Sequence, residues 1–352
     1  MRVHTRIPFI YFFHDSFRMN TRDEIIEALK GNRGDTAPPA IFTQTGTVSQ
    51  MDNCGCCWPE ANFDIAKMAE LSLQPSRMFG FATAKVPFCI TVETERFGAD
   101  LNPGEKGAQP SVAGSPFFSE EEIPDVPEFM SPAEYVAGGR CAVVCEAAAK
   151  IRREHPELFT IAGCTDPFTV SYLLTGVDNF LMGLLMDPDR CDAWVSAITP
   201  HLCEYVKVLS ENADDVQIIA EASSEIMPPE SFDQFVAGPV SKMISAAKGF
   251  TTIHSCGETS EVLDSLAGLG EDGLSVETYT GPEEIYERVS GKVRLLGGIP
   301  AVPLLYQGKP EAIVANARRY SDIGYALITP ECGVPPMTSN ANLEALAHYR
   351  EL

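Results

Sequence analysis

Three side chains that bind soft metal ions stand at the ends of predicted β-strands. His254 and Cys256 lie two residues apart in the segment HSCG, and Cys332 precedes Gly333 near the C-terminus. Side chains spaced by two project to the same side of an extended chain, so one ion could reach both His254 and Cys256. Imidazole nitrogen and thiolate sulfur are ligands of Zn²⁺, and three protein ligands leave a fourth position open, as in catalytic zinc sites. The alternative is that His254 belongs to the core and both cysteines are buried apolar fillers.

Two carboxylates follow other predicted strands and are candidate catalytic groups. Glu277 could ligate the metal at rest, accept a proton from a substrate, or only form a structural hydrogen bond. Asp166 could position a cofactor or a ligand histidine, or it could cap the helix that follows it. We therefore predict His254, Cys256 and Cys332 as metal ligands, and Glu277 and Asp166 as catalytic residues.

The elements that must position these residues alternate between strands and helices. Short apolar runs bounded by glycine, proline or polar residues predict eight strands. They cover Pro39–Thr43, Ala82–Val92, Phe159–Cys164, Val216–Ala220, Thr251–His254, Leu274–Glu277, Val293–Ile299 and Tyr325–Thr329. Eight parallel βα units favour a closed (β/α)8 barrel over a doubly wound open sheet. Active sites of such barrels lie at the C-terminal ends of the strands, where all the candidate residues fall.

Helical spacing of apolar residues predicts helices between the strands. They cover Thr21–Lys30, Ser131–His155, Asp178–Asp187, Cys191–Asn212, Pro229–Ala247, Glu258–Leu269, Gly281–Val289 and Pro310–Ile323. Residues 97–126 are rich in glycine, proline and acidic residues and predict a long loop. We expect one catalytic domain over residues 20–352, preceded by an extension, 1–19, that is separate from the fold.

Charge and cysteine content exclude several classes of protein. The chain has 26 Lys and Arg against 49 Asp and Glu, a formal net charge of −23, which argues against nucleic-acid or anionic membrane surfaces. The apolar run at residues 7–13 is too short to span a bilayer and lacks a clear cleavage site. Eleven cysteines without such a signal favour a reducing cytoplasm.

The metal-ligand pattern, together with motifs along the whole chain, resembles one known family. The H-x-C pair with a distant cysteine is similar to the zinc motif of the methylcobamide:coenzyme M methyltransferases, which belong to the uroporphyrinogen decarboxylase superfamily. The similarity extends to 43–47 (TQTGT), 58–61 (WPEA), 86–88 (VPF), 91–93 (TVE), 163–169 (GCTDPFT), 274–277 (LSVE) and 335–338 (PPMT). A porphyrinogen decarboxylase would need an arginine-rich segment after the first strand, and none is present there.

The resemblance implies a methyl transfer that depends on zinc. The methyl group would come from a methylated corrinoid on a separate small protein and pass to a thiol such as coenzyme M. Zinc would deprotonate that thiol, whose thiolate would attack the cobalt-bound methyl group in line and expel cob(I)amide. The anionic tail of coenzyme M would need a donor, for which Lys85 and Arg294 are candidates.

The sequence departs from the family at two places, and other functions stay open. Residues 221–224 read EASS where the family often has an aspartate, and the cluster Cys54, Cys56 and Cys57 is unexpected and is either a set of loop cysteines or a second metal site. One alternative is a related corrinoid methyltransferase with another donor or acceptor: a methylthiol, a methylamine, a methoxylated compound or a pterin. The others are an enzyme like uroporphyrinogen decarboxylase and a non-enzymatic corrinoid-binding or structural zinc protein.

Overall fold

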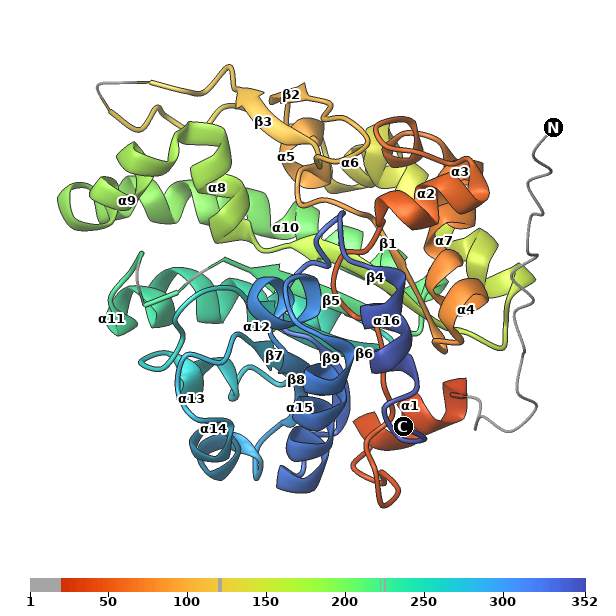
Figure 1. The fold of residues 1–352 in the computed structure, drawn as a ribbon. Coiled ribbons are helices and arrows are strands. Elements are labelled where there is room, and N and C mark those ends of the chain that lie inside the picture. Colours follow the sequence, from red (N-terminus) through yellow and green to blue (C-terminus); the bar gives the residue numbers. More distant parts are fainter. Residues whose placement is uncertain (1–19, 120–121, 222, 225) are drawn as a thin grey trace, which may run out of the picture.

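The computed structural model describes residues 20–119, 122–221, 223–224 and 226–352 (Figure 1). The predicted extension, 1–19, lies outside the described residues. No described helix is by itself long and apolar enough to cross a membrane. Helices α8 (Pro167–Thr175) and α9 (Val177–Met186), bent by 111° to each other, reach that length and composition only as a pair.

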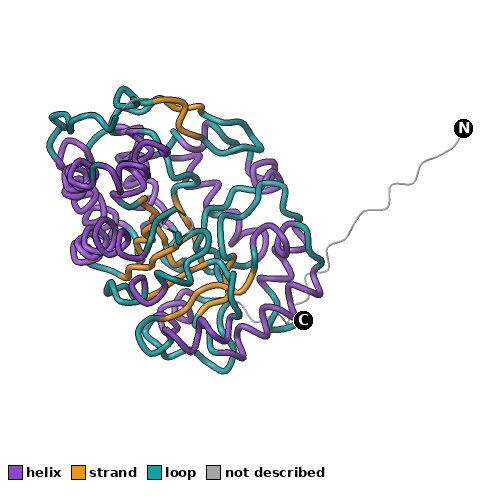
Figure 2. Tube along the Cα trace, turned by 90° about the vertical axis from the view of Figure 1, so that its left-hand side faces the viewer, coloured by secondary structure: helices purple, strands orange, loops and turns teal. Residues whose placement is uncertain are grey.

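A parallel sheet of seven strands forms the centre of the molecule, with helices around it (Figure 2). Its order is β1-β4-β5-β6-β7-β8-β9, so the strands follow one another around the sheet as they do along the chain. They are β1 (Thr83–Val86), β4 (Phe159–Thr165), β5 (Asp215–Ala220), β6 (Phe250–Ser255), β7 (Gly273–Val276), β8 (Arg294–Ile299) and β9 (Leu327–Pro330). This arrangement confirms the barrel type and seven of the predicted strands, although β1 is much shorter than 82–92.

The predicted first strand, Pro39–Thr43, forms only a single bridge, between Pro39 and Ile328. The Ala40 N–H donates to the Ile328 carbonyl at 2.9 Å, and the Ile41 N–H donates to the Thr83 hydroxyl at 3.1 Å. This segment therefore fills the space between β9 and β1. It fails to extend the sheet because the two prolines at 38 and 39 have no N–H to donate.

Several helices match their predictions. They are α1 (Arg22–Leu29), α9 (Val177–Met186), α10 (Pro188–Asn212), α14 (Pro282–Val289) and α15 (Pro310–Ile323). The segment predicted as one helix over Pro229–Ala247 comprises α11 (Pro229–Phe232), a π-helical turn (Asp233–Ala237) and α12 (Gly238–Ala246). Six helices were not predicted: α2 (Val48–Cys54), α3 (Ile65–Ser72), α4 (Gln74–Phe79), α5 (Val92–Arg96), α8 (Pro167–Thr175) and α16 (Asn340–Ala347).

Three other predictions are corrected by local chemistry. The helix expected over Ser131–His155 breaks into α6 (Pro132–Val136) and α7 (Gly139–Glu154) at Gly138 and Gly139, the latter with φ of +57°. The helix expected over Glu258–Leu269 is only α13 (Leu263–Leu266), because the Glu258 carboxylate accepts from the Ser260 N–H at 2.8 Å and holds a local turn instead. The predicted loop 97–126 contains a hairpin of β2 (Asp100–Asn102) and β3 (Ser111–Gly114).

Helix α1 covers the N-terminal end of the barrel, which we call the floor. A separate apolar cluster there joins Ile25, Ala28 and Leu29 of α1 to inward residues such as Phe159 and Leu296. The two ends of the described chain meet beside it: the Asn20 amide donates to the Ala347 carbonyl at 3.2 Å, and Arg350 donates to the Asn20 side chain at 2.6 Å. With the floor closed, the open end is the one where the strands terminate, which we call the mouth.

Candidate active site

The structure brings His254, Cys256 and Cys332 together at the mouth. His254 is the last but one residue of β6, Cys256 follows β6 directly, and Cys332 lies two residues beyond β9. Cys256 Sγ lies 3.2 Å from His254 Nε2 and 3.9 Å from Cys332 Sγ, although 76 residues separate the two cysteines. One ligand atom from each residue lies within 4.8 Å of the other two. Two strands far apart in the sequence thus converge on one point.

The geometry of these atoms fits a zinc ion. Two sulfur ligands about 2.3 Å from one Zn²⁺, in a tetrahedral arrangement, would lie about 3.8 Å apart. The observed separation of the two sulfurs, 3.9 Å, is close to this value. His254 is buried and both cysteines are only half-buried, so the group is partly open to solvent. The donor set therefore suits a metal that keeps one site for a substrate.

Electrostatic coupling between the two thiols favours metal binding. Donation of a hydrogen bond by Cys256, together with the proximity of His254, lowers the pKa of Cys332, whereas the same pairing and burial raise the pKa of Cys256. The thiol of Cys332 therefore loses its proton readily, whereas the thiol of Cys256 keeps its proton. A divalent cation would displace the proton of Cys256, because thiolate is the form that coordinates metals.

Ser275 fixes the orientation of the His254 ring. It lies on β7 opposite His254 in the strand register, and its Oγ is 3.1 Å from His254 Nδ1. Both residues are about 1% exposed, so the ring has little freedom to turn. A hydrogen bond at Nδ1 leaves Nε2 free to face Cys256 and an ion, which is how ligand histidines are usually held.

Glu277 directly follows β7 and borders His254, Cys256 and Cys332, which we call the metal-site residues because together they could hold an ion. Burial, and next the charge of Cys332, raise the pKa of its carboxyl, while a hydrogen bond from the Gly257 backbone opposes this effect. Glu277 is not among the group of mutually close ligand atoms. Its position therefore suits a proton acceptor beside the site better than a fourth protein ligand.

Glu331 holds the two loops that carry Glu277 and Cys332 together, and sequence reasoning did not identify it. Its buried carboxylate accepts from the Thr278 N–H at 3.1 Å and from the Thr278 hydroxyl at 2.7 Å. The hydroxyl of Tyr320 lies 3.0 Å from the Thr278 hydroxyl and completes the network. An acidic residue immediately before Cys332 was visible in the sequence, but its partner Thr278, two strands away in the sheet, was not.

Asp166 is the N-cap of α8. Its carboxylate accepts from the backbone N–H of Phe168 at 2.8 Å and of Thr169 at 3.2 Å, and also from the Thr169 hydroxyl. Burial nevertheless raises the pKa of Asp166 to about 6. Both oxygens are thus engaged by the helix, which supports the capping alternative over a catalytic role.

Replacing Asp166 with alanine should therefore reduce stability and leave catalysis intact. We expect the free energy of unfolding to fall by about 2 kcal/mol, because a buried cap with several donors is lost. Chemical denaturation measures this change, and Asp166→Asn, which keeps one acceptor oxygen, is the matched control. A variant of normal stability that lost its activity per folded molecule would instead restore the catalytic interpretation.

The buried carboxyl of Glu93, on α5, joins the ends of β1 and β4. It accepts from the Thr165 N–H at 3.1 Å and from the Thr165 hydroxyl at 3.2 Å, yet burial raises its pKa to about 7. A raised pKa means that the folded state retains a proton that the unfolded chain, with an ordinary value near 4.5, releases. Its contribution to stability is therefore complete below pH 4.5 and is lost as the pH rises to about 7.

The raised pKa of Glu93 predicts how the free energy of unfolding should depend on pH. Between pH 5.5 and 7, the unfolding free energy of the native chain should fall by about 1.5 kcal/mol relative to that of Glu93→Gln. Parallel denaturation of both proteins over that range, which lies above the isoelectric point of about 4.6, measures the difference. A constant difference would show that Glu93 does not change its proton occupancy on folding.

The two candidate donors for an anionic substrate lie in different places. Arg294 begins β8 at the floor, with its guanidinium against Gly31 next to α1, so it lies at the end of the barrel opposite the metal-site residues. Lys85 points into the barrel against Gly163, is about 1% exposed, and its Nζ has no hydrogen-bond partner. Burial lowers the pKa of Lys85 to about 8. Arg294 is therefore too distant to be a donor for an anionic substrate. Lys85 stays a candidate, because it is a buried cation without a hydrogen-bond partner.

Cys54, Cys56 and Cys57 do not form a recognisable metal site in the described part of the chain. All three are half-buried free thiols at the end of α2, where they pack against the core. Burial, and next the charge of Cys54, raise the pKa of Cys56 to about 11, which disfavours the thiolate that would bind a metal. The interpretation as loop cysteines agrees with this geometry.

Comparison with known proteins relates the whole barrel to one family. Residues 20–351 match the family model for uroporphyrinogen decarboxylase (URO-D). The chain is 31% identical to the methylcobamide:CoM methyltransferase MtaA of Methanosarcina barkeri, over 95% of this chain and 98% of that protein. It is 30% identical to the methylcobamide:CoM methyltransferase MtbA of Methanosarcina acetivorans, over 92% and 96% of the two chains.

A solved structure gives the same result. A methyltransferase from Methanosarcina mazei superposes with a TM-score of 0.86 at 32% identity, and covers 93% of this chain and 97% of its own. Agreement over nearly the full length of both chains extends to the overall architecture and is not limited to short motifs. The chain therefore belongs to the uroporphyrinogen decarboxylase family and, within it, to the methylcobamide:CoM methyltransferases.

Proposed function

We propose that this enzyme moves a methyl group from a methylated corrinoid, carried on a small partner protein, to a thiol such as coenzyme M, and that it needs zinc to do so. The convergence of one imidazole and two sulfurs at the barrel mouth carries the proposal, because this donor set suits the activation of a thiol. We further propose that residues 20–352 are one catalytic domain acting in the cytoplasm, where eleven free cysteines would stay reduced.

The charge of the ligand set suits this reaction. His254, Cys256 and Cys332 would hold the ion, and a Zn²⁺ there would keep the substrate thiol ionised at neutral pH. Two cysteinates balance the charge of the ion, so a bound thiolate would keep more electron density on its sulfur than three neutral histidines would allow. Ser275 keeps Nε2 of His254 directed at the site. These residues therefore favour a nucleophilic sulfur.

The remaining steps balance without further reagents. The thiol gives its proton to the carboxylate of Glu277, whose raised pKa makes it a better acceptor. The thiolate sulfur attacks the methyl carbon, and the carbon–cobalt bond breaks with both electrons left on cobalt, which yields a thioether and cob(I)amide. Closure of the floor by α1 leaves the mouth as the approach for both substrates.

Metal analysis combined with an activity assay tests the proposal. The purified chain should contain close to one zinc per molecule and should demethylate methylcobalamin in the presence of coenzyme M. A panel of other thiols and a pterin identifies the acceptor. Chelation should abolish activity while circular dichroism shows a retained fold, because an open site is not needed for folding. A chain that was inactive with every acceptor while loaded with zinc would contradict the proposal.

A further inference from the structure

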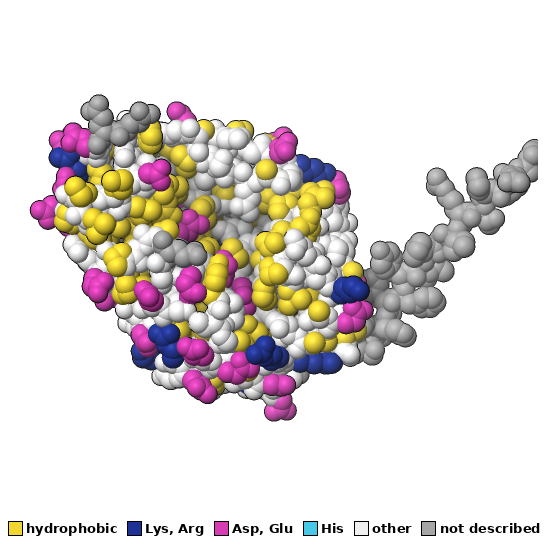
Figure 3. Space-filling view, turned by 60° about the vertical axis from the view of Figure 1, so that its left-hand side comes forward, with side chains coloured by type: hydrophobic (Ala, Val, Ile, Leu, Met, Phe, Trp, Pro, Cys, Tyr) yellow, Lys and Arg dark blue, Asp and Glu magenta, His cyan; other side chains and the backbone are white. Residues whose placement is uncertain are grey.

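Exposed apolar side chains are concentrated at the mouth of the barrel. Among the described residues, eleven large hydrophobic side chains are exposed. Ten of them lie in the connections that follow a strand, or that follow the segment Pro39–Thr43, and that precede the helix returning along the barrel. Leu352 is the exception. They are Phe63, Phe118, Val177, Met182, Leu185, Met186, Tyr279, Val302, Tyr306 and Met337. Figure 3 shows hydrophobic side chains bordering a hollow in this face of the molecule.

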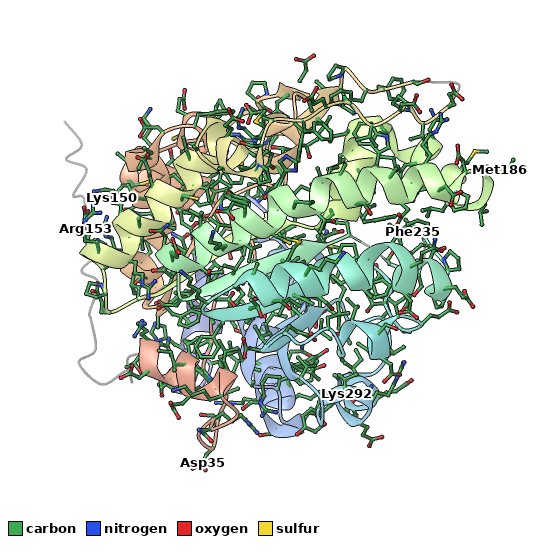
Figure 4. The ribbon with its side chains drawn as sticks, turned by 180° about the vertical axis from the view of Figure 1, so that it is seen from behind. Asp35, Lys150, Arg153, Met186, Phe235 and Lys292 are labelled. Carbon is green, nitrogen blue, oxygen red and sulfur yellow. The ribbon has the colours of Figure 1, made fainter. Side chains whose placement is uncertain are left out.

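The largest part of this surface lies along α9. Val177, Met182, Leu185 and Met186, which we call the α9 face, are 44%, 65%, 77% and 80% exposed. The opposite side of the helix is buried through Phe180 and Leu184, so the exposure does not come from a detached helix. Met186 lies at the outer edge of the molecule, across from Lys150 and Arg153 of α7 (Figure 4).

Neighbouring segments extend the α9 face. The ring of Phe118 packs over Gly176, where an added Cβ would lie 2.8 Å from it, and the Asn179 amide donates to the Ser119 carbonyl. Val302 and Tyr306 follow β8, and Met337 lies five residues beyond Cys332. The exposed apolar surface thus comes from loops on several sides of the metal-site residues.

We propose that this surface, centred on the α9 face, docks the protein that carries the methylcorrinoid. The inference rests on the proposed function and adds the place of contact. An occupant that covers loops after several strands must be far larger than a thiol, and it must present its reactive group to the site that those loops surround. Exposed flexible methionines, here Met182, Met186 and Met337, are typical of surfaces that adapt to a partner.

Charge distinguishes this occupant from a second copy of the chain. Two copies that each carry a net charge of −23 would repel one another on approach. Asp178, Asp187 and Asp189 are exposed and flank the α9 face. We therefore expect a partner whose contact surface is apolar at its centre and basic at its border.

A comparison of two methyl donors tests the surface separately from the chemistry. Leu185→Asp and Met186→Asp are combined in one variant, because both side chains are more than three-quarters exposed and their replacement should leave the fold intact. The donors are free methylcobalamin and a methylated corrinoid protein. The corrinoid protein is chosen by screening several of them for one that the native chain demethylates. Leu352→Asp, at an apolar position 58% exposed and away from the mouth, is the matched control.

The double variant should raise the KM for the protein-bound donor about tenfold or more, with kinetics for free methylcobalamin unchanged. The control should alter neither. An unchanged KM for the protein donor, or an equal loss with both donors, would overturn the inference. So would a native chain that uses methylcobalamin but no corrinoid protein, or one that sediments as a dimer that the double variant dissociates. A native chain inactive even with methylcobalamin would instead contradict the proposed function.

Discussion

Replacing Cys332 with alanine should remove both the metal and the activity. The remaining pair, His254 and Cys256, would leave the ion with two protein ligands, and the coupling that lowers the pKa of Cys332 would disappear. We expect the zinc content after dialysis to fall to background and kcat for the demethylation of methylcobalamin to fall by about a thousandfold, equivalent to about 4 kcal/mol of lost transition-state stabilisation.

The matched control for this variant is Cys203→Ala. Cys203 is also a half-buried free cysteine, but it lies on α10, away from the mouth. It should retain both zinc and activity. If Cys332→Ala kept a full complement of tightly bound zinc, Cys332 would not be a ligand. The ligands would then have to come from the ends of β6 and β7.

Replacing Glu277 with glutamine should separate catalysis from metal binding. The amide cannot accept the proton of the thiol, so we expect kcat to fall by about a hundredfold, in the range usual for loss of a general base. Zinc content should be unchanged, because the carboxylate lies beside the metal-site residues and outside their group. Proton release on thiol binding, followed with a pH indicator in weak buffer, measures the missing step directly.

The control for Glu277→Gln is Glu283→Gln, an exposed position paired with Arg319 on the outer helices. This control tests whether the loss of one negative charge anywhere on this acidic protein changes kcat. A Glu277→Gln enzyme with native kcat and native proton release would exclude Glu277 from the chemistry. Loss of zinc in this variant would favour the other role considered for it, that of a resting ligand.

The sequence predicted that His254, Cys256 and Cys332 would lie close together, and the structure confirms this proximity. His254 and Cys256 share one strand end, and the barrel rule places the end of β9 at the same mouth, so Cys332 could be matched to them across 76 residues. Ser275 and Glu331 escaped prediction because serine and glutamate are common on strand ends. Their roles depend on contacts between strands that spacing along one chain does not specify: β6 with β7 for Ser275, and β7 with β9 across β8 for Glu331.

Errors in the predicted elements have equally local causes. The apolar residues of Pro39–Thr43 predict a strand, but Pro38 and Pro39 lack N–H groups, so this segment cannot donate the hydrogen bonds of a full strand. Helix α8 was missed although Asp166-Pro167 is a good start signal, because its residues are apolar on nearly all sides and show no helical stripe. Capping of the following helix was one of the two roles expected for Asp166, and the hydrogen bonds of its carboxylate support that role.

Asn20, where the described part of the chain begins, contacts Ala347 and Arg350 beneath the floor, so sequence order matters little to this barrel. In a chain without residues 1–19, a short peptide would join Leu352 to Asn20 without disturbing the strands. A circularly permuted chain, opened for example in the hairpin loop between β2 and β3, should reach the same closed architecture. The order in which strands leave the ribosome would change, while the set of residues gathered at the mouth would not.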